Sequence, residues 1–227
     1  MPEQIKAKEP FKFYTRLHLS ELTGLRATTL GQLAGLIKKV PGSSIYHHTH
    51  RFLQQHQYLS PEPPNDFAYW VTEILGEDEL GEKLASIDTI QYSTIRALRE
   101  KIVSTIEGHL KNNVLAKLRF ARSQEEFYFM KSVSFVLPTG YSAVDLKEFT
   151  EALRKITIDS IYFHIFEARL RLERGGNDFS NWIEDSLGDK GLADEISNLD
   201  PYTQTLENLR NALIRILEKR MGTQWRT

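Results

Sequence analysis

The chain of 227 residues carries one long sequence pattern twice, and this repeat constrains the fold more than any short motif does. The segment SSIYHHTHRF, which begins at Ser43, matches DSIYFHIFEA, which begins at Asp159. Further along, NDFAYWVTEILG from Asn65 matches NDFSNWIEDSLG from Asn177. The identities in the first pair are Ser44, Ile45, Tyr46 and His48 against Ser160, Ile161, Tyr162 and His164. We therefore predict an internal duplication of a unit of about a hundred residues, the size of a small domain.

The same register extends toward the N-terminus and sets the predicted boundaries. Phe11 and Phe13 pair with Phe127 and Phe129, and the dipeptide Thr23-Gly24 recurs as Thr139-Gly140. We predict a tail at 1–10, a first repeat unit at 11–111, a connector at 112–126, a second repeat unit at 127–220 and a tail at 221–227. The connector is expected to continue the last helix of the first unit rather than to form a floppy linker.

Helix signals dominate each copy. Alternation of apolar and polar residues is confined to FKFYT at 11–15 and FYFMKSVSF at 127–135. Asn65 and Asn177 are placed to cap a helix, and Gly76 and Gly188 are placed to end it. We expect a mainly α protein of two tandem helical units, each a small bundle that opens with a short extended aromatic segment. Their likeness predicts packing about an approximate two-fold axis.

Composition narrows the possible functions. The formal charge is -1, so no global field attracts nucleic acid, and the basic residues in and beside the connector (Lys111, Lys117, Arg119, Arg122) are too few to alter this. The absence of cysteine excludes disulfides, thiolate nucleophiles and cysteine-bound zinc. The N-terminus lacks an apolar leader and no run of residues suits a spanning helix, so we expect a cytoplasmic protein without a membrane partner.

The cluster SSIYHHTH contains two weak candidates for a metal site. His47 and His50 lie on neighbouring turns of a helix, which is the usual argument for an H-x-x-H site. The second copy has Phe163 and Phe166 at these positions, and a third ligand such as His56 would still be needed. Solvated helix surface is the more typical interpretation, and we predict no metal here.

His48 and His164 differ from these two because both copies keep them. Each lies on or beside the apolar stripe of its helix, which indicates a buried ring. The structural interpretation is that the ring N–H is satisfied by a carbonyl or by the Asp of N-D-F, which locks two helices together. The alternative is a cleft between the copies in which these side chains bind a ligand or transfer protons; its candidate residues are Tyr46, His48, Asp66, Tyr162, His164 and Asp178.

The pattern S-I-Y-x-H followed by N-D-F-x-x-W-[VI]-x-x-x-L-G resembles an uncharacterised family of bacterial and archaeal domains of unknown function. The resemblance covers nearly the whole chain and occurs in both copies. It implies no activity, so it supports the domain division and leaves the function open.

The function that these observations favour is a non-catalytic interaction or regulatory protein that binds a protein or a small ligand between its two helical units. The alternative is a metal-dependent or His/Asp acid–base enzyme, a hydrolase or transferase, with its site at the interface of the units. No phosphate-binding, dinucleotide-binding or nucleophile-elbow motif occurs, so neither a cofactor nor a catalytic residue is indicated.

Overall fold

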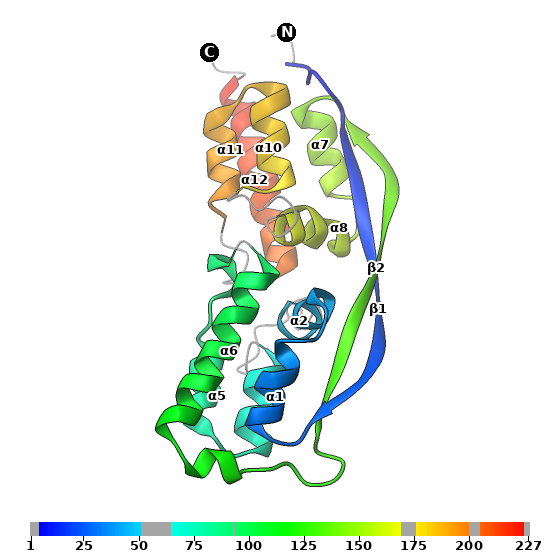
Figure 1. Ribbon diagram of the computed structural model, residues 1–227. Coiled ribbons are helices and arrows are strands. Elements are labelled where there is room, and N and C mark those ends of the chain that lie inside the picture. The colour runs from blue at the N-terminus through cyan, green and yellow to red at the C-terminus, as the bar shows by residue number, and fades with distance from the viewer. Residues whose placement is uncertain (1–4, 51–64, 93, 169–175, 200–204, 225–227) are drawn as a thin grey trace. The chain divides into compact units, whose positions relative to one another are not determined.

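The computed structural model describes residues 5–50, 65–92, 94–168, 176–199 and 205–224. Its most extended elements are two strands, β1 (Phe11–Ala27) and β2 (Phe127–Ala143), which pair side by side as a two-stranded antiparallel sheet (Figure 1). The fold is therefore mixed α/β, and the prediction of a mainly α chain of tandem helical units is wrong. What the sequence presents as short aromatic segments are the first residues of strands 17 residues long.

Helices follow each strand in the same order. After β1 come α1 (Leu30–Ile37), α2 (Gly42–Thr49), α4 (Asp66–Tyr69), the π-helical turn η1 (Trp70–Ile74), α5 (Asp78–Ala85), η2 (Thr89–Gln91), α6 (Ile95–Asn112) and the 3-10 turn η3 (Leu115–Leu118). After β2 come α7 (Leu146–Leu153), α8 (Ile158–Tyr162), η4 (Phe163–Glu167), α10 (Asp178–Trp182), η5 (Ile183–Leu187), α11 (Lys190–Ser197) and α12 (Leu206–Gln224).

The local signals for helix ends are confirmed. The side chains of Asn65 and Asn177 accept hydrogen bonds from the backbone N–H groups three residues further on, as an N-cap does. Gly76 and Gly188 end the helical segments that follow, with φ angles of 65° and 70° that favour glycine. These signals could be predicted because they depend on a few neighbouring residues.

The described residues form two compact units, and each unit takes half of each strand. The α1–α6 unit contains residues 18–50 and 65–134, whereas the α7–α12 unit contains residues 5–17 and everything described from 135 onward. The compact units therefore do not coincide with the sequence ranges 11–111 and 127–220. The aromatic start of each strand packs on the helices of the other copy.

Two aromatic clusters show this exchange of strands. In the α7–α12 unit, the ring of Phe13 lies 5.2 Å from that of Phe149, and Phe11 lies 5.5 Å from Phe179. In the α1–α6 unit, Phe127 stacks on Phe67 at 5.2 Å. All of these rings are buried in two hydrophobic cores, one in each unit. Each unit thus depends on a strand segment that is remote in sequence.

Within the part of the chain that the structure describes, no helix has the length and apolar character needed to cross a bilayer.

Candidate functional site

His48 is fully engaged by hydrogen bonds in the α1–α6 unit. It lies on α2, is buried, and its Nε2 accepts the backbone N–H of Met130 on β2 at 3.0 Å. Because Nε2 is an acceptor, the ring proton is on Nδ1, and this N–H donates to Oδ2 of Asp66 at 2.8 Å. Both ring nitrogens of the neutral imidazole therefore have partners.

His164 repeats this geometry in the α7–α12 unit. Its Nε2 accepts the backbone N–H of Tyr14 on β1 at 2.9 Å, and its Nδ1 donates to Oδ2 of Asp178 at 2.7 Å. Of the two partners that the sequence leaves open for each ring N–H, a carbonyl or the Asp of N-D-F, the structure has the Asp. The histidine, however, contacts a strand as well as a helix.

A serine one helical turn before each histidine completes the contact. Ser44 donates from Oγ to the carbonyl of Met130, and Ser160 donates to the carbonyl of Tyr14, both at 2.6 Å. Serine and histidine together hold the N–H and the C=O of a single strand residue. We call these groups the strand clamps; one consists of Ser44, His48 and Asp66, and the other of Ser160, His164 and Asp178.

Other recurring residues also hold the exchanged strands by their backbone. Trp70 donates from Nε1 to the carbonyl of Glu125 at 2.7 Å, and Trp182 donates to that of Glu9 at 2.8 Å. Thr23 donates to the carbonyl of Phe129 at 2.6 Å, and Thr139 to that of Phe13 at 2.8 Å. The repeated motifs S-I-Y-x-H, N-D-F-x-x-W and T-G therefore bind the backbone of the extended chain, in addition to the ring contacts that N-D-F makes with Phe127.

The predicted cleft residues are divided equally between the units, three in each. Tyr46 lies beside its clamp, where its ring stacks between His18 at 5.5 Å and His50 at 5.4 Å. Tyr162 is buried and stacks on Phe166 at 4.9 Å. Both tyrosine rings therefore pack in the interior of their units.

The weak metal candidates have protein partners. His47 Nδ1 forms a hydrogen bond with Ser132 Oγ at 3.2 Å, and His50 Nδ1 forms one with Thr49 Oγ1 at 2.8 Å. Among the described residues no three His, Asp or Glu side chains are grouped so that they could hold a metal ion. His56 lies outside the described residues.

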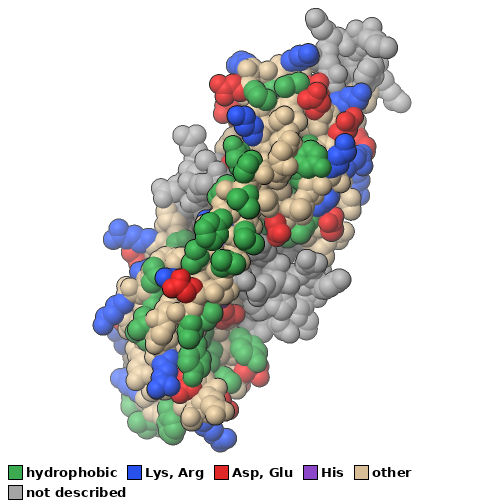
Figure 2. Space-filling view, turned by 90° about the vertical axis from the view of Figure 1, so that its right-hand side faces the viewer, with side chains coloured by type: hydrophobic (Ala, Val, Ile, Leu, Met, Phe, Trp, Pro, Cys, Tyr) green, Lys and Arg blue, Asp and Glu red, His purple; other side chains and the backbone are tan. Residues whose placement is uncertain are grey.

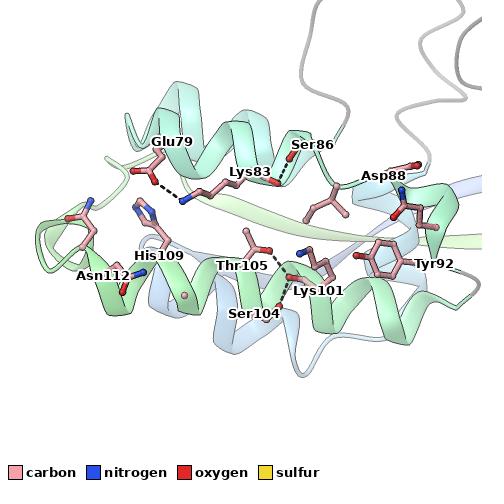
Figure 3. A pocket seen from close by; sticks show the side chains of 14 residues that line it. Glu79, Lys83, Ser86, Asp88, Tyr92, Lys101, Ser104, Thr105, His109 and Asn112 are labelled. Carbon is pink, nitrogen blue, oxygen red and sulfur yellow. Dashed lines mark hydrogen bonds and ion pairs between the residues drawn. The ribbon is translucent and has the colours of Figure 1, made fainter.

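A polar cavity of about 730 Å³ lies between α5 and α6 in the α1–α6 unit, and Figure 3 shows its lining. Lys83 and Glu79 form an ion pair at 2.6 Å at one end, and this lysine holds the pKa of Glu79 below its ordinary value. Tyr92 and Asp88 lie toward the other end. The sequence gives no sign of this cavity, because its hydroxyl, amide and charged groups are what a solvated helix face also carries.

His109, on the wall of this cavity, belongs to a recurring link between helices. Its Nε2 lies 2.9 Å from Oε2 of Glu77, and both side chains are buried. At the equivalent place in the α7–α12 unit, Arg220 forms two hydrogen bonds with Asp189, at 2.7 and 2.8 Å. Because a basic side chain and an acid recur there, the structural interpretation of His109 is favoured over a catalytic one.

The connector presents the most exposed apolar side chains of the described chain. Four of them (Val114, Leu115, Leu118 and Phe120) are between 67% and 72% exposed. We call residues 113–122 the apolar turn. The prediction that the connector continues the preceding helix is not met, because α6 ends at Asn112.

The backbone of the apolar turn is anchored although its side chains are exposed. Ala116 and Ala121 are buried, and the N–H of Ala116 donates to Oδ1 of Asn113 at 3.2 Å. The N–H of Ala121 donates to the carbonyl of Thr28 at 2.8 Å. The backbone of the turn is therefore held in place through Asn113, Ala116 and Ala121, while its large apolar side chains remain exposed.

The two strand clamps occur in a chain that matches a known family over most of its length. The model of a family described as "Family of unknown function (DUF5752)" matches residues 8–218. The chain belongs to the DUF5752 family. This confirms the resemblance to a family of unknown function. A solved structure described as "The structure of OrfY from Thermoproteus tenax" is 33% identical to this DUF5752 chain, with a TM-score of 0.79, and the match covers 94% of this chain and 96% of that one. No curated protein matches.

Proposed function

We propose that this protein is a non-catalytic interaction protein that docks onto a partner protein through the apolar turn. The observation that carries the proposal is the presence of four large apolar side chains, about 70% exposed, on an anchored backbone. Soluble proteins seldom keep a group of such residues in water unless something covers it. Since the backbone is already ordered, binding would cost little conformational entropy.

The alternative, an acid–base enzyme using the histidines, has less support. A general base needs a nitrogen that can reach a substrate proton. Nε2 of His48 accepts the N–H of Met130 and its Nδ1 is bonded to Asp66, so neither nitrogen is open to a substrate in this arrangement. The buried position of the ring favours the same conclusion.

The charge around the apolar turn indicates the chemistry of the partner. Arg119 lies 3.5 Å from Glu77, and Lys111, Lys117 and Arg122 add positive charge to the same stretch, because residues 111–124 contain no Asp or Glu. Complementarity then favours a partner surface that is apolar and bears Asp or Glu side chains. The proposal places binding on the α1–α6 unit, which contains the whole turn.

Site-specific photo-crosslinking tests the proposal. A benzophenone amino acid at position 120 is expected to cross-link one protein in an extract of the source organism. The matched control is the same amino acid at position 69, where Tyr69 is also an exposed aromatic of the α1–α6 unit. The cross-linked protein is then purified and its Kd for the wild type and for Leu118→Asp is measured, with Tyr69→Asp as the control variant. We expect the affinity to fall at least about tenfold for Leu118→Asp alone.

Three results would overturn this proposal. The first is equal cross-linking from positions 69 and 120, and the second is an affinity that Leu118→Asp leaves unchanged. The third is binding of the purified chain to vesicles of anionic lipid, or to RNA, that Leu118→Asp abolishes, because the turn would then serve a different class of partner.

A second candidate function, binding of a small polar ligand, is favoured by the cavity between α5 and α6. Asn113 lines this cavity and also caps the apolar turn, so the two features share a residue. Free amino acids, nucleosides and monosaccharides can be screened by the increase in Tm that they cause. A stabilising compound should lose its effect in Thr105→Leu, which fills the cavity, and a screen without any such compound would count against this candidate.

A further inference from the structure

The cavity between α5 and α6 lies where α6 carries smaller side chains than its counterpart in the repeat. Its wall includes Ser104, Thr105 and Gly108, whereas the equivalent residues of α12 are Arg215, Ile216 and Lys219. Ile216 packs against the core of its own unit. The cavity volume of about 730 Å³ falls within the roughly 300 to 1,000 Å³ that small-molecule sites occupy. The α1–α6 unit therefore has room beside α5 for a small ligand.

One nitrogen of His109 is available to such a ligand. The ring belongs to the cavity wall, the residue is only 6% exposed, and its Nε2 lies 2.9 Å from Oε2 of Glu77. Because a carboxylate can only accept, Nε2 carries the ring proton, and Nδ1 of the neutral ring is an acceptor. The described residues offer this Nδ1 no donor. A buried acceptor without a donor is unfavourable, so a ligand hydroxyl would supply a group that the wall lacks.

The repeat shows that the link to the acid does not require histidine. Arg220 stands at the place of His109, and its Nε and Nη2 both bond to Asp189, which stands at the place of Glu77. A guanidinium has donors only. Arginine therefore supplies the link between helices without an acceptor, whereas histidine supplies the link and leaves one acceptor over.

Three hydroxyl groups of the cavity add further acceptors. Ser104 and Thr105 donate to the carbonyl of Lys101, at 2.9 and 2.8 Å (Figure 3). Ser86 donates to the carbonyl of Lys83 at 3.0 Å. These hydroxyl protons are committed to helix backbone, and the three oxygens remain able to accept from a ligand.

The charges of the lining balance. Two acids, Glu79 and Asp88, line the cavity together with two bases, Lys83 and Lys101, and Glu79 is paired with Lys83 at 2.6 Å. Asn113 adds an amide that can donate. An anionic or a cationic ligand would meet as much like charge as opposite charge, so the lining favours a ligand without net charge.

The lining also differs from the strand face of the chain. Figure 2 looks onto β1 and β2 and shows hydrophobic side chains gathered along them. In the cavity, by contrast, Ile87 is the only aliphatic side chain among the described residues of the lining, and Tyr92 adds one aromatic ring. A ligand that suits the cavity is therefore rich in polar groups.

We propose that the cavity binds an uncharged ligand with several hydroxyl groups, a mono- or disaccharide, and that Nδ1 of His109 accepts a hydrogen bond from one of these hydroxyls. Each sugar hydroxyl can both donate and accept, which matches a wall that offers acceptors and donors without net charge. This inference rests on the second candidate function, small-ligand binding in the cavity, and assigns the class of ligand and a residue that recognises it.

Titration calorimetry of the full chain with glucose, galactose, maltose and sucrose tests the proposal. We expect saturable binding of one molecule per chain by at least one of these sugars. His109→Arg should weaken this binding at least about tenfold, because it removes the acceptor. It should keep the wild-type Tm, because Arg220 shows that arginine maintains the link between helices. His109→Gln, whose amide both donates and accepts, should retain more of the affinity. Glu73→Gln, on η1 and outside the cavity lining, is the control and should bind as the wild type does.

Thr105→Ile keeps the test decisive if His109→Arg fails to fold. It places at position 105 the residue that the repeat has at 216, and it should fill the cavity and abolish sugar binding. Wild-type affinity in both variants, or no saturable binding of any of the four sugars, would overturn the proposal. Glucose 6-phosphate or a free amino acid that binds more tightly than the sugars, and loses its affinity in Thr105→Ile, would refute the ligand class while small-ligand binding stands. If no sugar, nucleoside or amino acid raises Tm, the ligand class and the candidate function both fail.

Discussion

The Nε2 atom of His48 accepts the backbone N–H of Met130, 82 residues further along the chain, at 3.0 Å. This bond joins a helix of one sequence copy to the strand that opens the other. The bond between His164 and Tyr14 joins a helix of the second copy to the strand that opens the first. The most conspicuous side chains of the repeat therefore serve to fix which strand segment each unit contains.

Removal of either histidine should destabilise the fold. His48→Ala and His164→Ala each leave a buried N–H and a carboxylate without their partner, and we expect each to lower the free energy of unfolding by roughly 1 to 3 kcal/mol. Urea denaturation followed by circular dichroism measures this. His47→Ala is the matched control, since His47 precedes His48 on the same helix and its Nδ1 bonds to the hydroxyl of Ser132. An equal loss in the control would contradict the clamp.

Serine and histidine of one clamp should act as a unit. Ser44 and His48 hold the C=O and the N–H of the same residue, so once one is removed the strand residue can shift and the other contact is worth less. A double-mutant cycle of Ser44→Ala and His48→Ala should therefore give a coupling free energy of roughly 0.5 to 3 kcal/mol. As a control, Ser44→Ala combined with His164→Ala crosses the two clamps and should be additive.

The carboxylate of Glu126 should make stability depend on pH on the acid side. Its pKa is lowered from the ordinary value of 4.5 mainly by hydrogen bonds from the backbone, with Arg26 adding to the effect. A lowered pKa in the folded state means that the unfolded state binds the proton more readily. The contribution is therefore fully present above about pH 4.5 and is lost as the pH falls through the folded pKa.

A comparison of Tm against pH for the wild type and Glu126→Gln checks this sign. We expect the wild type to be the more stable protein at neutral pH and the difference to shrink below about pH 4.5. Glu73→Gln, which changes a carboxyl on η1 in the same unit, provides the control. A difference between wild type and Glu126→Gln that grows on acidification would contradict the assigned direction.

Local features of this fold could be predicted from the sequence because they depend on neighbouring residues. The caps at Asn65 and Asn177 and the left-handed glycine at Gly76 are of this kind. The Asp of N-D-F could be named as one of two possible partners of His48 and His164, because both residue types recur together, but the sequence does not decide between it and a carbonyl.

The length and the placement of the strands could not be predicted in this way. The apolar alternation of the sequence reaches Leu19, but Leu17 and Leu19 are half exposed, and from Ser20 onward the alternation that identifies a strand is lost, long before β1 ends. Because the two copies are alike in sequence, the sequence also does not show that each strand packs on the helices of the other copy. The two sets of helices present nearly the same clamp to the strand segments around Phe13 and Phe129, and a local pattern cannot decide which set receives which strand.

The exposure of the apolar turn also could not be predicted from the sequence, because it depends on a tertiary contact. Leu115 and Leu118 follow an amphipathic helix at a spacing of three, which favours a continued buried stripe. Their exposure arises because α6 ends at Asn112 and the chain turns toward Thr28, a tertiary contact that leaves no signal in the connector.

If each strand packs on the helices of the other copy, truncation of a strand residue should loosen the helices of that other copy rather than those that follow it in sequence. Phe13 is buried among the helices of the α7–α12 unit, although it precedes α1 in sequence. Phe13→Ala should cost roughly 3 to 5 kcal/mol and should raise amide hydrogen exchange first in α7 and α8. Phe129→Ala, the equivalent change in the repeat, should instead raise exchange first in α1 and α2. Mass spectrometry of peptides from the four helices distinguishes the two patterns. If Phe13→Ala loosened α1 and α2 while α7 and α8 stayed protected, each strand would pack on its own copy and the exchange would be disproved.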